Sequence, residues 1–292
     1  MSAPKPAALS PALVARLSKR ADQHKYDHGH ALVLSGGPGR GGAARLAARA
    51  ALRVGAGLVT LGCPPDAVPE NAAQLTAVML RPVAGSAGLK ALLTDTRLNA
   101  LCLGPGLGEA AACRDLVRVA LAARRPTVLD ADALTAFEGR AAELFAQLHG
   151  AAVLTPHGGE FARLFPDLAA PIHGQAAEAA QDPRRDAVRQ AAARTGAVVL
   201  LKGAVTIVAD PSGHVAELHL TRGAAVPWLA TAGAGDVLSG LIAGLLARGF
   251  SAFQAAETGA WLHAAAGRAA GPGLIAEDLP ERIPQVFRDL GV

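Results

Sequence analysis

Aromatic residues, cysteine and lysine are all scarce in this chain of 292 residues. Aromatic side chains make up 3% of it, and its basic residues are spread without a cluster, although the net charge is +4. Nucleic-acid binding draws on basic patches and stacking aromatics, so we expect no nucleic-acid partner. The three cysteines, Cys63, Cys102 and Cys113, are odd in number and lack C-x-x-C spacing, which argues against a disulfide framework or a structural zinc site.

Long apolar runs are also missing. No stretch of about 18 apolar residues occurs, and the N-terminus has no basic segment followed by an apolar one. We therefore expect a soluble protein without a membrane partner, in the reducing cytoplasm. Hydrophobic residues still make up 51% of the chain, which suffices for a large core. We expect a single domain over residues 1–292, with residues 1–24 as a leading segment.

Short apolar strands alternate with helical segments, a pattern typical of an α/β fold with a mainly parallel central sheet. The sequence predicts strands over residues 31–35, 57–63, 76–80, 100–103, 126–130, 152–155 and 197–202, and a hairpin over 205–209 and 215–220. It predicts helices over residues 12–19, 43–54, 87–94, 183–195, 233–249, 253–269 and 279–290, and another that ends near residue 123. For residues 166–182 the sequence predicts a surface segment, an excursion from the sheet and helix layers, without regular structure.

Two glycine-rich loops, residues 36–42 and 104–108, each follow a strand and precede a helix. In a parallel sheet such loops lie at the carboxyl-terminal edge, where ligands of open α/β sheets bind, so they predict one crevice. The first loop also satisfies G-x-G-x-x-G, which favours a dinucleotide-binding dehydrogenase as a second interpretation. The acid expected after the next strand is poorly placed for that interpretation, because Pro64 and Pro65 come before Asp66.

Polar residues follow three further strands at the same predicted edge. Asp130 ends one strand and is followed by Asp132, which is placed to cap the next helix. His157 and Glu160 lie in the exit loop of another strand, and Lys202 ends a third. A lone polar residue in a loop is usually solvated, but the strand-end position favours a role in a site. A lysine there suits phosphate as a compact point charge.

The stretch from Leu229 to Gly249 predicts a loop that becomes a helix. Gly233 and Gly235 leave backbone N–H groups uncovered at the junction, which together with the helix dipole favour an anion. Asp236 lies at this junction and supports two interpretations, a helix N-cap or a carboxylate held ionised beside bound phosphate and able to take a proton from a hydroxyl. The same aspartate could fill both roles.

Six segments together resemble the ADP-dependent (S)-NAD(P)H-hydrate dehydratases of the ribokinase-like superfamily. The resemblance spans about residues 25–290. The matching strings are AALRVGAGLVT at 50–60, LGPGLG at 103–108, LDADAL at 129–134, LTPHGGE at 154–160, LKGAVT at 201–206 and LATAGAGDVLSG at 229–240. The resemblance implies a three-layer α/β/α ribokinase-like fold and the stand-alone form of the enzyme, without the epimerase domain that is fused in some relatives.

The resemblance also implies site residues and small-molecule partners. The positions that match the family's adenine-nucleotide site are Lys202, Gly203, Ala204, Val205, Thr206, Gly233, Ala234 and Gly235. The positions that match its hydrated-cofactor site are Ala43, Gly106, His157 and Asp236. Mg²⁺ would accompany the nucleotide phosphates without direct protein ligands, and Glu160 could act on it through water. A homotetramer is common in the family.

The implied reaction converts (S)-NADHX and (S)-NADPHX to NADH and NADPH while ADP becomes AMP and phosphate, with Asp236 as the catalytic base; ATP is an alternative co-substrate. Two other functions remain open from the sequence: a ribokinase-like kinase of a small vitamin-precursor alcohol, which would use the same aspartate, and a nucleotide sensor without catalysis. The chain departs from the family pattern at Gly158, where proline is frequent, at Gly37-Pro38, where Gly-Ser is frequent, and at Trp228, where a small residue is common.

Overall fold

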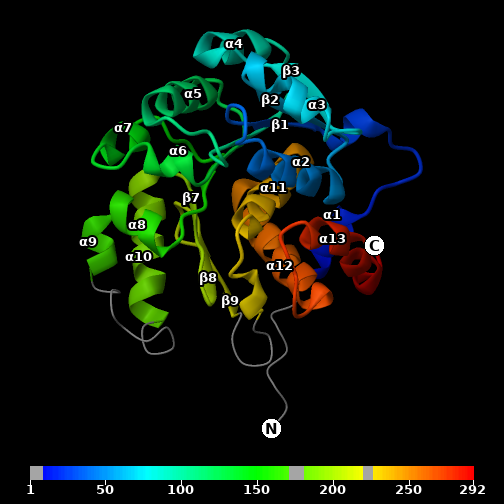
Figure 1. Ribbon diagram of the computed structural model, residues 1–292. Helices are drawn as coiled ribbons and strands as arrows, with labels where there is room; N and C mark the ends of the chain where they lie inside the picture. Colours follow the sequence, from blue (N-terminus) through cyan, green and yellow to red (C-terminus); the bar gives the residue numbers. More distant parts are fainter. Residues whose placement is uncertain (1–8, 171–180, 220–225) are drawn as a thin grey trace.

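The computed structural model describes residues 9–170, 181–219 and 226–292, and a nine-stranded sheet runs through these segments (Figure 1). The strand order is β3-β2-β1-β4-β5-β6-β7-β8-β9. The strands are β1 (His30–Leu34), β2 (Leu58–Cys63), β3 (Met79–Pro82), β4 (Ala100–Leu103), β5 (Thr127–Leu129), β6 (Ala152–Leu154), β7 (Val198–Leu201), β8 (Val205–Ala209) and β9 (Val215–His219).

Strands β1 to β7 pair in parallel, and β8 and β9 extend one edge of the sheet in antiparallel pairing. Strands β4 to β7 are buried along their whole length, as expected for parallel strands covered on both faces. The predicted α/β class with a mainly parallel sheet is confirmed, and so is the hairpin, apart from Leu220, which lies outside the described residues.

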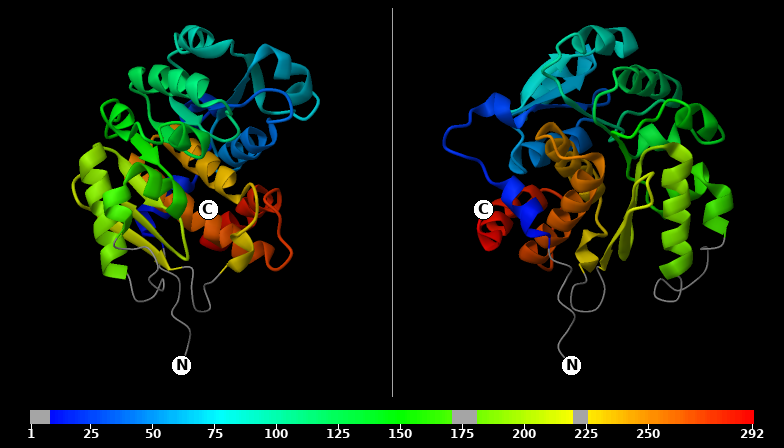
Figure 2. Two further views of the ribbon diagram at one scale, coloured as in Figure 1. Left: turned by 60° about the vertical axis from the view of Figure 1, so that its left-hand side comes forward. Right: turned by 180° about the vertical axis from the view of Figure 1, so that it is seen from behind.

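Helices cover both faces of the sheet and complete three layers, which Figures 1 and 2 show from several directions. The core on one face includes α1 (Pro11–Leu17), α2 (Gly42–Arg53), α11 (Ala234–Ala247), α12 (Ala252–Ala270) and α13 (Asp278–Leu290). The core on the other face includes α4 (Gly85–Leu92), α5 (Ala110–Ala122), α6 (Asp132–Thr135), α7 (Ala141–Phe145), α8 (Gly158–Leu164), α9 (Pro166–Ala169) and α10 (Gln181–Thr195). The short α3 (Val68–Ala72) leads toward β3.

Helices α2 and α11 pack closely at two glycines. A Cβ atom added to Gly240 would lie 2.1 Å from the carbonyl oxygen of Ala47, and one added to Gly244 would lie 2.4 Å from Val54 Cγ1. The face of α11 that carries these two glycines therefore meets the backbone of α2. This contact fixes the two helices relative to each other, and both of them begin at the edge of the sheet where the candidate site lies.

The structure corrects the predicted limits of several elements. The strand expected over residues 76–80 is β3 at Met79–Pro82, because it is an edge strand with no buried residue and pairing with β2 sets its limits. The surface excursion expected over residues 166–182 contains α9, and α10 begins at Gln181, while residues 171–180 lie outside the described part. The short helices α3 and α7 were not predicted, since five residues are too few to show a helical period.

All three cysteines are free and buried. Cys63 ends β2, Cys102 lies within β4 and Cys113 lies in α5. Burial raises the pKa of the Cys113 thiol to about 12, and burial together with the nearby Asp130 raises the pKa of the Cys102 thiol even further. Within the described residues, no helix has both the length and the apolar composition needed to cross a membrane.

Candidate active site

Helix α11 begins at the glycine loop that the sequence singled out. Gly233 is its N-cap and adopts φ 86°, a left-handed conformation that favours glycine, and Asp236 is the third residue of the helix. The N-cap interpretation of Asp236 is therefore wrong, because the chain enters the helix three residues earlier. The carboxyl group lies in the first turn, where the helix N-terminus presents backbone N–H groups.

An ion pair between the partly buried Lys202 and the buried Asp130 lies directly against this loop. Lys202 Nζ donates to Asp130 Oδ1 over 2.8 Å, and the hydroxyl of Ser239 donates to Asp130 Oδ2 over 2.6 Å. A Cβ atom added to Gly235 would lie 3.4 Å from Lys202 Nζ, so the glycine leaves the ammonium group open toward the loop. The carboxylate of Asp130, which is 1% exposed, thus connects the end of β5, the end of β7 and the first turns of α11.

Burial dominates the electrostatics of Asp236. Burial and, to a smaller extent, the nearby Asp130 raise the pKa of this carboxyl group to about 6, against the opposing effect of Lys202. The sequence predicts a carboxylate that the helix terminus holds ionised; in the structure, desolvation and the neighbouring acids outweigh the helix terminus and bring its pKa closer to neutral pH. A carboxyl group with a pKa near 6 is ionised at pH 7 and is a stronger base than an ordinary aspartate.

The loop of residues 104–108 joins the same site from the other side. A Cβ atom at Gly104 would lie 1.6 Å from the carbonyl oxygen of Asp130, so only glycine allows this approach. A Cβ atom at Gly106 would lie 3.8 Å from Ala43 Cβ, which places these two predicted substrate-site residues together at the start of α2. The Gly108 N–H donates to Asp132 Oδ2 over 2.8 Å, so Asp132 holds this loop rather than capping α6, whose N-cap is Ala131.

His157 and Glu160 cap helix α8 together. His157 Nδ1 accepts from the N–H of Gly159 over 2.9 Å, and the N–H of His157 donates to Glu160 Oε2 over 2.8 Å. The ring of His157 is exposed, whereas Glu160 is buried with Oε2 3.9 Å from Lys202 Nζ. Glu160 therefore faces the site, and His157 presents its ring at the surface beside it.

The predicted nucleotide segment at 203–206 is divided between surface and core. Gly203 and Ala204 are exposed, while Val205 and Thr206 begin β8 and are buried, so Val205 can offer a ligand little more than its backbone. A Cβ atom at Gly203 would lie 2.9 Å from a terminal nitrogen of Arg184. Within the described residues, the buried Nε of Arg184 has no hydrogen-bond partner.

His263 of α12 contacts the first residue of α11, directly after the glycine N-cap. Its Nε2 lies 2.9 Å from the carbonyl oxygen of Ala234, and because a carbonyl can only accept, Nε2 carries the proton. Burial lowers the pKa of His263 to about 4, so the ring is neutral at pH 7. This neutral donor holds the first turn of α11 in place.

The structure brings together Asp236, Lys202, Gly233, Ala234 and Gly235, and it adds partners that the sequence did not single out as site residues. Asp130 had a signal, because it ends a buried strand. Nothing in the sequence marked Ser239, His263 or Arg184 as site residues. Each of them reaches the site from within a helix, and the sequence of that helix predicts only a helix packed on the sheet. Ser239 and His263 are buried polar residues with hydrogen bonds to the site.

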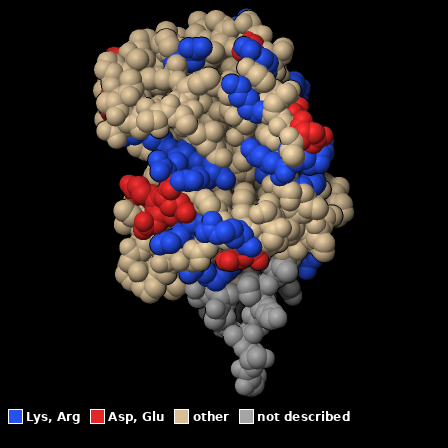
Figure 3. Space-filling model, turned by 90° about the vertical axis from the view of Figure 1, so that its right-hand side faces the viewer, with Lys and Arg blue, Asp and Glu red and all other residues tan. Residues whose placement is uncertain are grey.

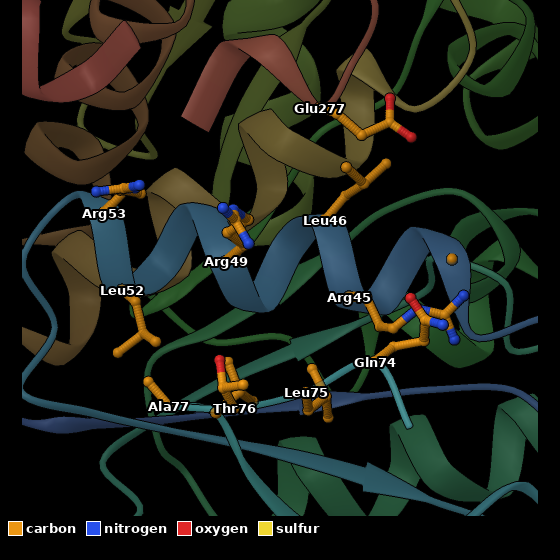
Figure 4. Close-up of a pocket in the computed structure, with 12 residues that line it drawn as sticks. Arg45, Leu46, Arg49, Leu52, Arg53, Gln74, Leu75, Thr76, Ala77 and Glu277 are labelled. Carbon is orange, nitrogen blue, oxygen red and sulfur yellow. The ribbon is translucent and has the colours of Figure 1, made fainter. Parts of the chain in front are cut away.

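A hollow of about 580 Å³ runs beside the site along α2. Figure 4 shows Arg45, Arg49 and Arg53 along this helix, with residues 74–77 crossing below it and Leu46 and Glu277 above. The arginines have acidic partners: Arg45 pairs with Glu70, and Arg49 and Arg53 pair with Glu281. Figure 3 shows that acidic and basic side chains are interspersed on this side of the molecule. None of the predicted site residues lines the hollow.

The acids of the site do not form a ready metal cage. Among residues 9–170, 181–219 and 226–292, no three His, Cys, Asp or Glu side chains lie close enough to hold a metal ion together. A hard cation such as Mg²⁺ can instead be held largely by phosphate oxygens and water. Glu160, buried and close to Lys202, is positioned to accept hydrogen bonds from such water.

Comparison with known proteins identifies the family. Residues 31–285 match the Carb_kinase family, which is described as NAD(P)H-hydrate dehydratase. The chain belongs to the NAD(P)H-hydrate dehydratase family. It is 40% identical over 286 residues to the bifunctional NAD(P)H-hydrate repair enzyme Nnr of Moorella thermoacetica, covering 93% of this chain and 52% of the relative. The corresponding enzyme of Coxiella burnetii is 39% identical over 269 residues, covering 90% and 51%. The chain thus spans about half the length of the curated relatives it matches.

Solved structures agree with this family membership. The ADP/ATP-dependent NAD(P)H-hydrate dehydratase from Bacillus subtilis, co-crystallized with ATP and Mg²⁺, aligns with a TM-score of 0.73 and 29% identity over 95% of this chain and 96% of that one. A ribokinase-like superfamily protein from Enterococcus faecalis aligns with a TM-score of 0.75 at 21% identity over 97% and 95%, which shows the fold alone. The predicted family and the ribokinase-like fold are confirmed. The dehydrogenase interpretation of the first glycine loop is set aside.

Proposed function

We propose that this protein repairs hydrated nicotinamide cofactors: it removes water from (S)-NADHX and (S)-NADPHX while it converts ADP to AMP and phosphate. The observation that carries the proposal is the arrangement at the start of α11, where Asp236, with a pKa near 6, lies in the first turn beside the glycines of the helix N-terminus and the Lys202 ammonium group. Such a site can accept a proton and neutralise a phosphoryl group at one place. The family membership and the co-crystallization of the B. subtilis relative with ATP and Mg²⁺ support the same conclusion.

Hydroxide is a poor leaving group, so the hydroxyl of the substrate must first be activated. In the proposed reaction, Asp236 accepts the hydroxyl proton while the hydroxyl oxygen attacks the terminal phosphorus of ADP and AMP leaves. The electron pair of the ring nitrogen then expels phosphate, and that phosphate carries away the hydroxyl oxygen. Loss of a proton from the neighbouring ring carbon, to water or to the departing phosphate, restores the ring double bond. The products are NAD(P)H, AMP and phosphate.

The remaining groups stabilise negative charge. Lys202 and the backbone N–H groups of Gly233 to Gly235 would contact the transferring phosphoryl group, and Asp130 with Ser239 would keep the Lys202 ammonium group in position. Bound Mg²⁺ would add positive charge at the phosphates, and Glu160 would orient its water. Ala43, Gly106 and His157 would line the hydrated-cofactor site, and Gly203 to Thr206 the nucleotide site.

The decisive experiment is incubation of the protein with hydrated NADH and ADP, ATP or no nucleotide, while the absorbance of reduced nicotinamide and the release of phosphate are followed. We expect NADH and phosphate to appear together, faster with ADP than with ATP. Asp236→Asn should lower turnover by about 100-fold or more, because positioned bases contribute about that factor. Asp289→Asn, at an exposed acid on α13, is the matched control and should leave turnover unchanged.

The products also separate this proposal from the two other functions. A kinase would leave a stable phosphate ester of a small alcohol, with no gain of reduced nicotinamide. A sensor would bind nucleotide without forming any product. Either result, with properly folded protein, would overturn the proposed dehydratase activity.

The proposal includes a homotetramer in the cytoplasm, as the family resemblance implies. Light scattering on the purified protein should give a mass four times that of the 29.4 kDa chain. A monomeric mass at working concentration would contradict the assembly while leaving the reaction untouched.

A further inference from the structure

Two exposed apolar side chains line one hollow beside the glycine loop. Among the described residues, Trp228 is 51% exposed and Ile275 is 53% exposed. Both line a hollow of about 390 Å³, together with Pro227, Thr231 and Leu274. Single exposed apolar residues are ordinary, but a large aromatic and a branched aliphatic side chain in the same depression are suited to bind an apolar face.

Trp228 points outward because residues on both sides of it in the chain are packed against α12. Val226 and Leu229 pack on α12 at Gly267, where a Cβ atom would lie 2.8 Å from Val226 Cγ1 and 3.0 Å from Leu229 Cδ2. Between them, Pro227 begins the single turn of η4 (Pro227–Leu229), which the N–H of Leu229 closes on the carbonyl of Val226. Trp228 is therefore presented by a fixed turn.

The hollow adjoins the start of α11. Its Thr231 comes two residues before Gly233, the N-cap of that helix. On the other side, Ile275 precedes Ala276, whose Cβ would lie 2.8 Å from a Cβ atom added to Gly233. The apolar depression and the proposed phosphate site therefore have adjacent walls. A nucleotide carries its base one sugar away from its phosphates, which matches this arrangement.

We propose that Trp228 is the stacking platform for the base of the nucleotide co-substrate, with Ile275 as the apolar wall beside it. The inference rests on the proposed function, in which the phosphates of ADP bind at Gly233 to Gly235. Among the described residues that line the hollow, the polar side-chain atoms are the Thr231 hydroxyl and the Trp228 indole N–H. Stacking on an aromatic face therefore provides most of the recognition of the base.

Tryptophan emission gives a direct test, because the chain has two tryptophans, Trp228 and Trp261. ADP should quench the emission of the unmodified protein, and inorganic pyrophosphate, which has no base, should not. Trp228→Phe keeps a ring for stacking but removes the reporting indole, so ADP should no longer quench its emission. Quenching by ADP that persists in Trp228→Phe, or no quenching in the unmodified protein, would overturn the proposal.

Kinetics give the second test. Trp228→Ala should raise the KM for ADP by about 5- to 100-fold and leave kcat within about twofold, because stacking holds the nucleotide equally before and during the reaction. Trp228→Phe should stay within about threefold of the unmodified protein. Tyr26→Ala removes another half-exposed aromatic side chain, in the short 3-10 helix η1 (Lys25–His28), and serves as the control with unchanged KM. A KM for ADP that Trp228→Ala leaves unchanged would contradict the stacking role.

The two tests distinguish failure of this inference from failure of the proposed function. Normal turnover of hydrated NADH with ADP in Trp228→Ala, at an unchanged KM, would refute the platform and leave the dehydratase proposal intact. Quenching of Trp228 by ADP without any turnover of hydrated NADH would refute the dehydratase proposal and support the platform.

Discussion

At the scale of single residues, the site depends on one carboxyl group whose surroundings oppose its charge. Asp236 lies in the first turn of α11, which favours a negative charge, but burial and Asp130 outweigh that effect and raise its pKa to about 6. The protein thus keeps an acidic side chain where its charge is costly. Such positions are typical of functional sites, because a carboxylate that is poorly stabilised accepts a proton more readily.

The pH dependence of turnover should report this group. If Asp236 must be ionised to accept the proton, kcat/KM should be constant above pH 7 and should fall about tenfold per pH unit well below pH 6. The measurement is initial rates over a pH series at low substrate concentration. A profile that stays flat down to pH 4.5 would show that another group accepts the proton.

The same group should make stability depend on pH. Its pKa is 3.8 before perturbation and about 6 in the folded protein, so the folded state binds the proton more tightly. The associated stability is fully present below pH 3.8 and is lost as the pH rises through 6. Asp236→Asn should therefore raise the free energy of unfolding at pH 8 by about 3 kcal/mol and change it little at pH 4. Denaturant unfolding at both pH values tests this; an equal effect at both would contradict the assigned cause.

At the scale of elements, glycine decides how closely the helices of the site can approach. Gly240 and Gly244 let the backbone of α2 lie against α11, and the start of α2 carries Ala43 while the start of α11 carries Asp236. The contact that stabilises the layer therefore also sets the relative position of two predicted site residues.

Gly240→Ala should destabilise the protein by about 3 kcal/mol, because the new methyl group would meet the carbonyl oxygen of Ala47 and one helix must move. Turnover should fall as well, since both helices begin at the site. Gly158→Ala is the matched control, because no atom lies within 4 Å of its added Cβ. Thermal unfolding of the two variants measures the difference, and comparable melting temperatures would argue against a tight contact between α2 and α11.

Gly158→Pro should stabilise the protein by about 0.4 to 1 kcal/mol. Gly158 is the first residue of α8, a position that suits proline, and His157 before it is extended with φ −81° and ψ 173°. The open space at Gly158 leaves room for the ring. Glycine in place of the family's frequent proline at position 158 thus makes the start of α8 less rigid and leaves its backbone geometry unchanged. Urea unfolding should show a higher midpoint, whereas a lower one would mean that the helix start needs glycine.

At the scale of the whole molecule, the sequence predicts the layers better than it predicts the chemistry. Buried strands such as β4 and β6 are short apolar runs that end at glycine or a polar residue, so their limits can be read locally. The pKa of Asp236 cannot be predicted locally, because it depends on burial and on Asp130, which is distant in sequence and becomes a neighbour only through the sheet order. The edge strand β3 was misplaced for a related reason, since its pairing with β2 and not its own composition sets its position.

The site itself collects the ends of several parallel strands. Asp130 after β5 and Lys202 after β7 lie against Gly235 in the first turn of α11. Glu160 after β6 lies near Lys202, the loop after β4 lies against Asp130, and the loop after β1 lies against the loop after β4. The glycines and strand-end charges are visible in the sequence, because their residue types are unusual in those places. Support from inside helices, by Ser239 and His263, is not visible there, since a buried polar side chain in an apolar helix has no local signature.

The reactivity of the three buried cysteines can also be used to follow local and global opening of the folded protein. Cys102 lies in the central strand β4, Cys113 in a covering helix and Cys63 at the end of β2, so the three positions sample different depths of the structure. Since the thiolate is the reactive form and burial disfavours it, a thiol reagent should label Cys102 only when the sheet itself opens. We expect Cys102 to react last, at the rate of global unfolding, in a time course followed by mass spectrometry of each cysteine. Prompt labelling of Cys102 in the native protein would reveal breathing of the sheet that its packing does not suggest.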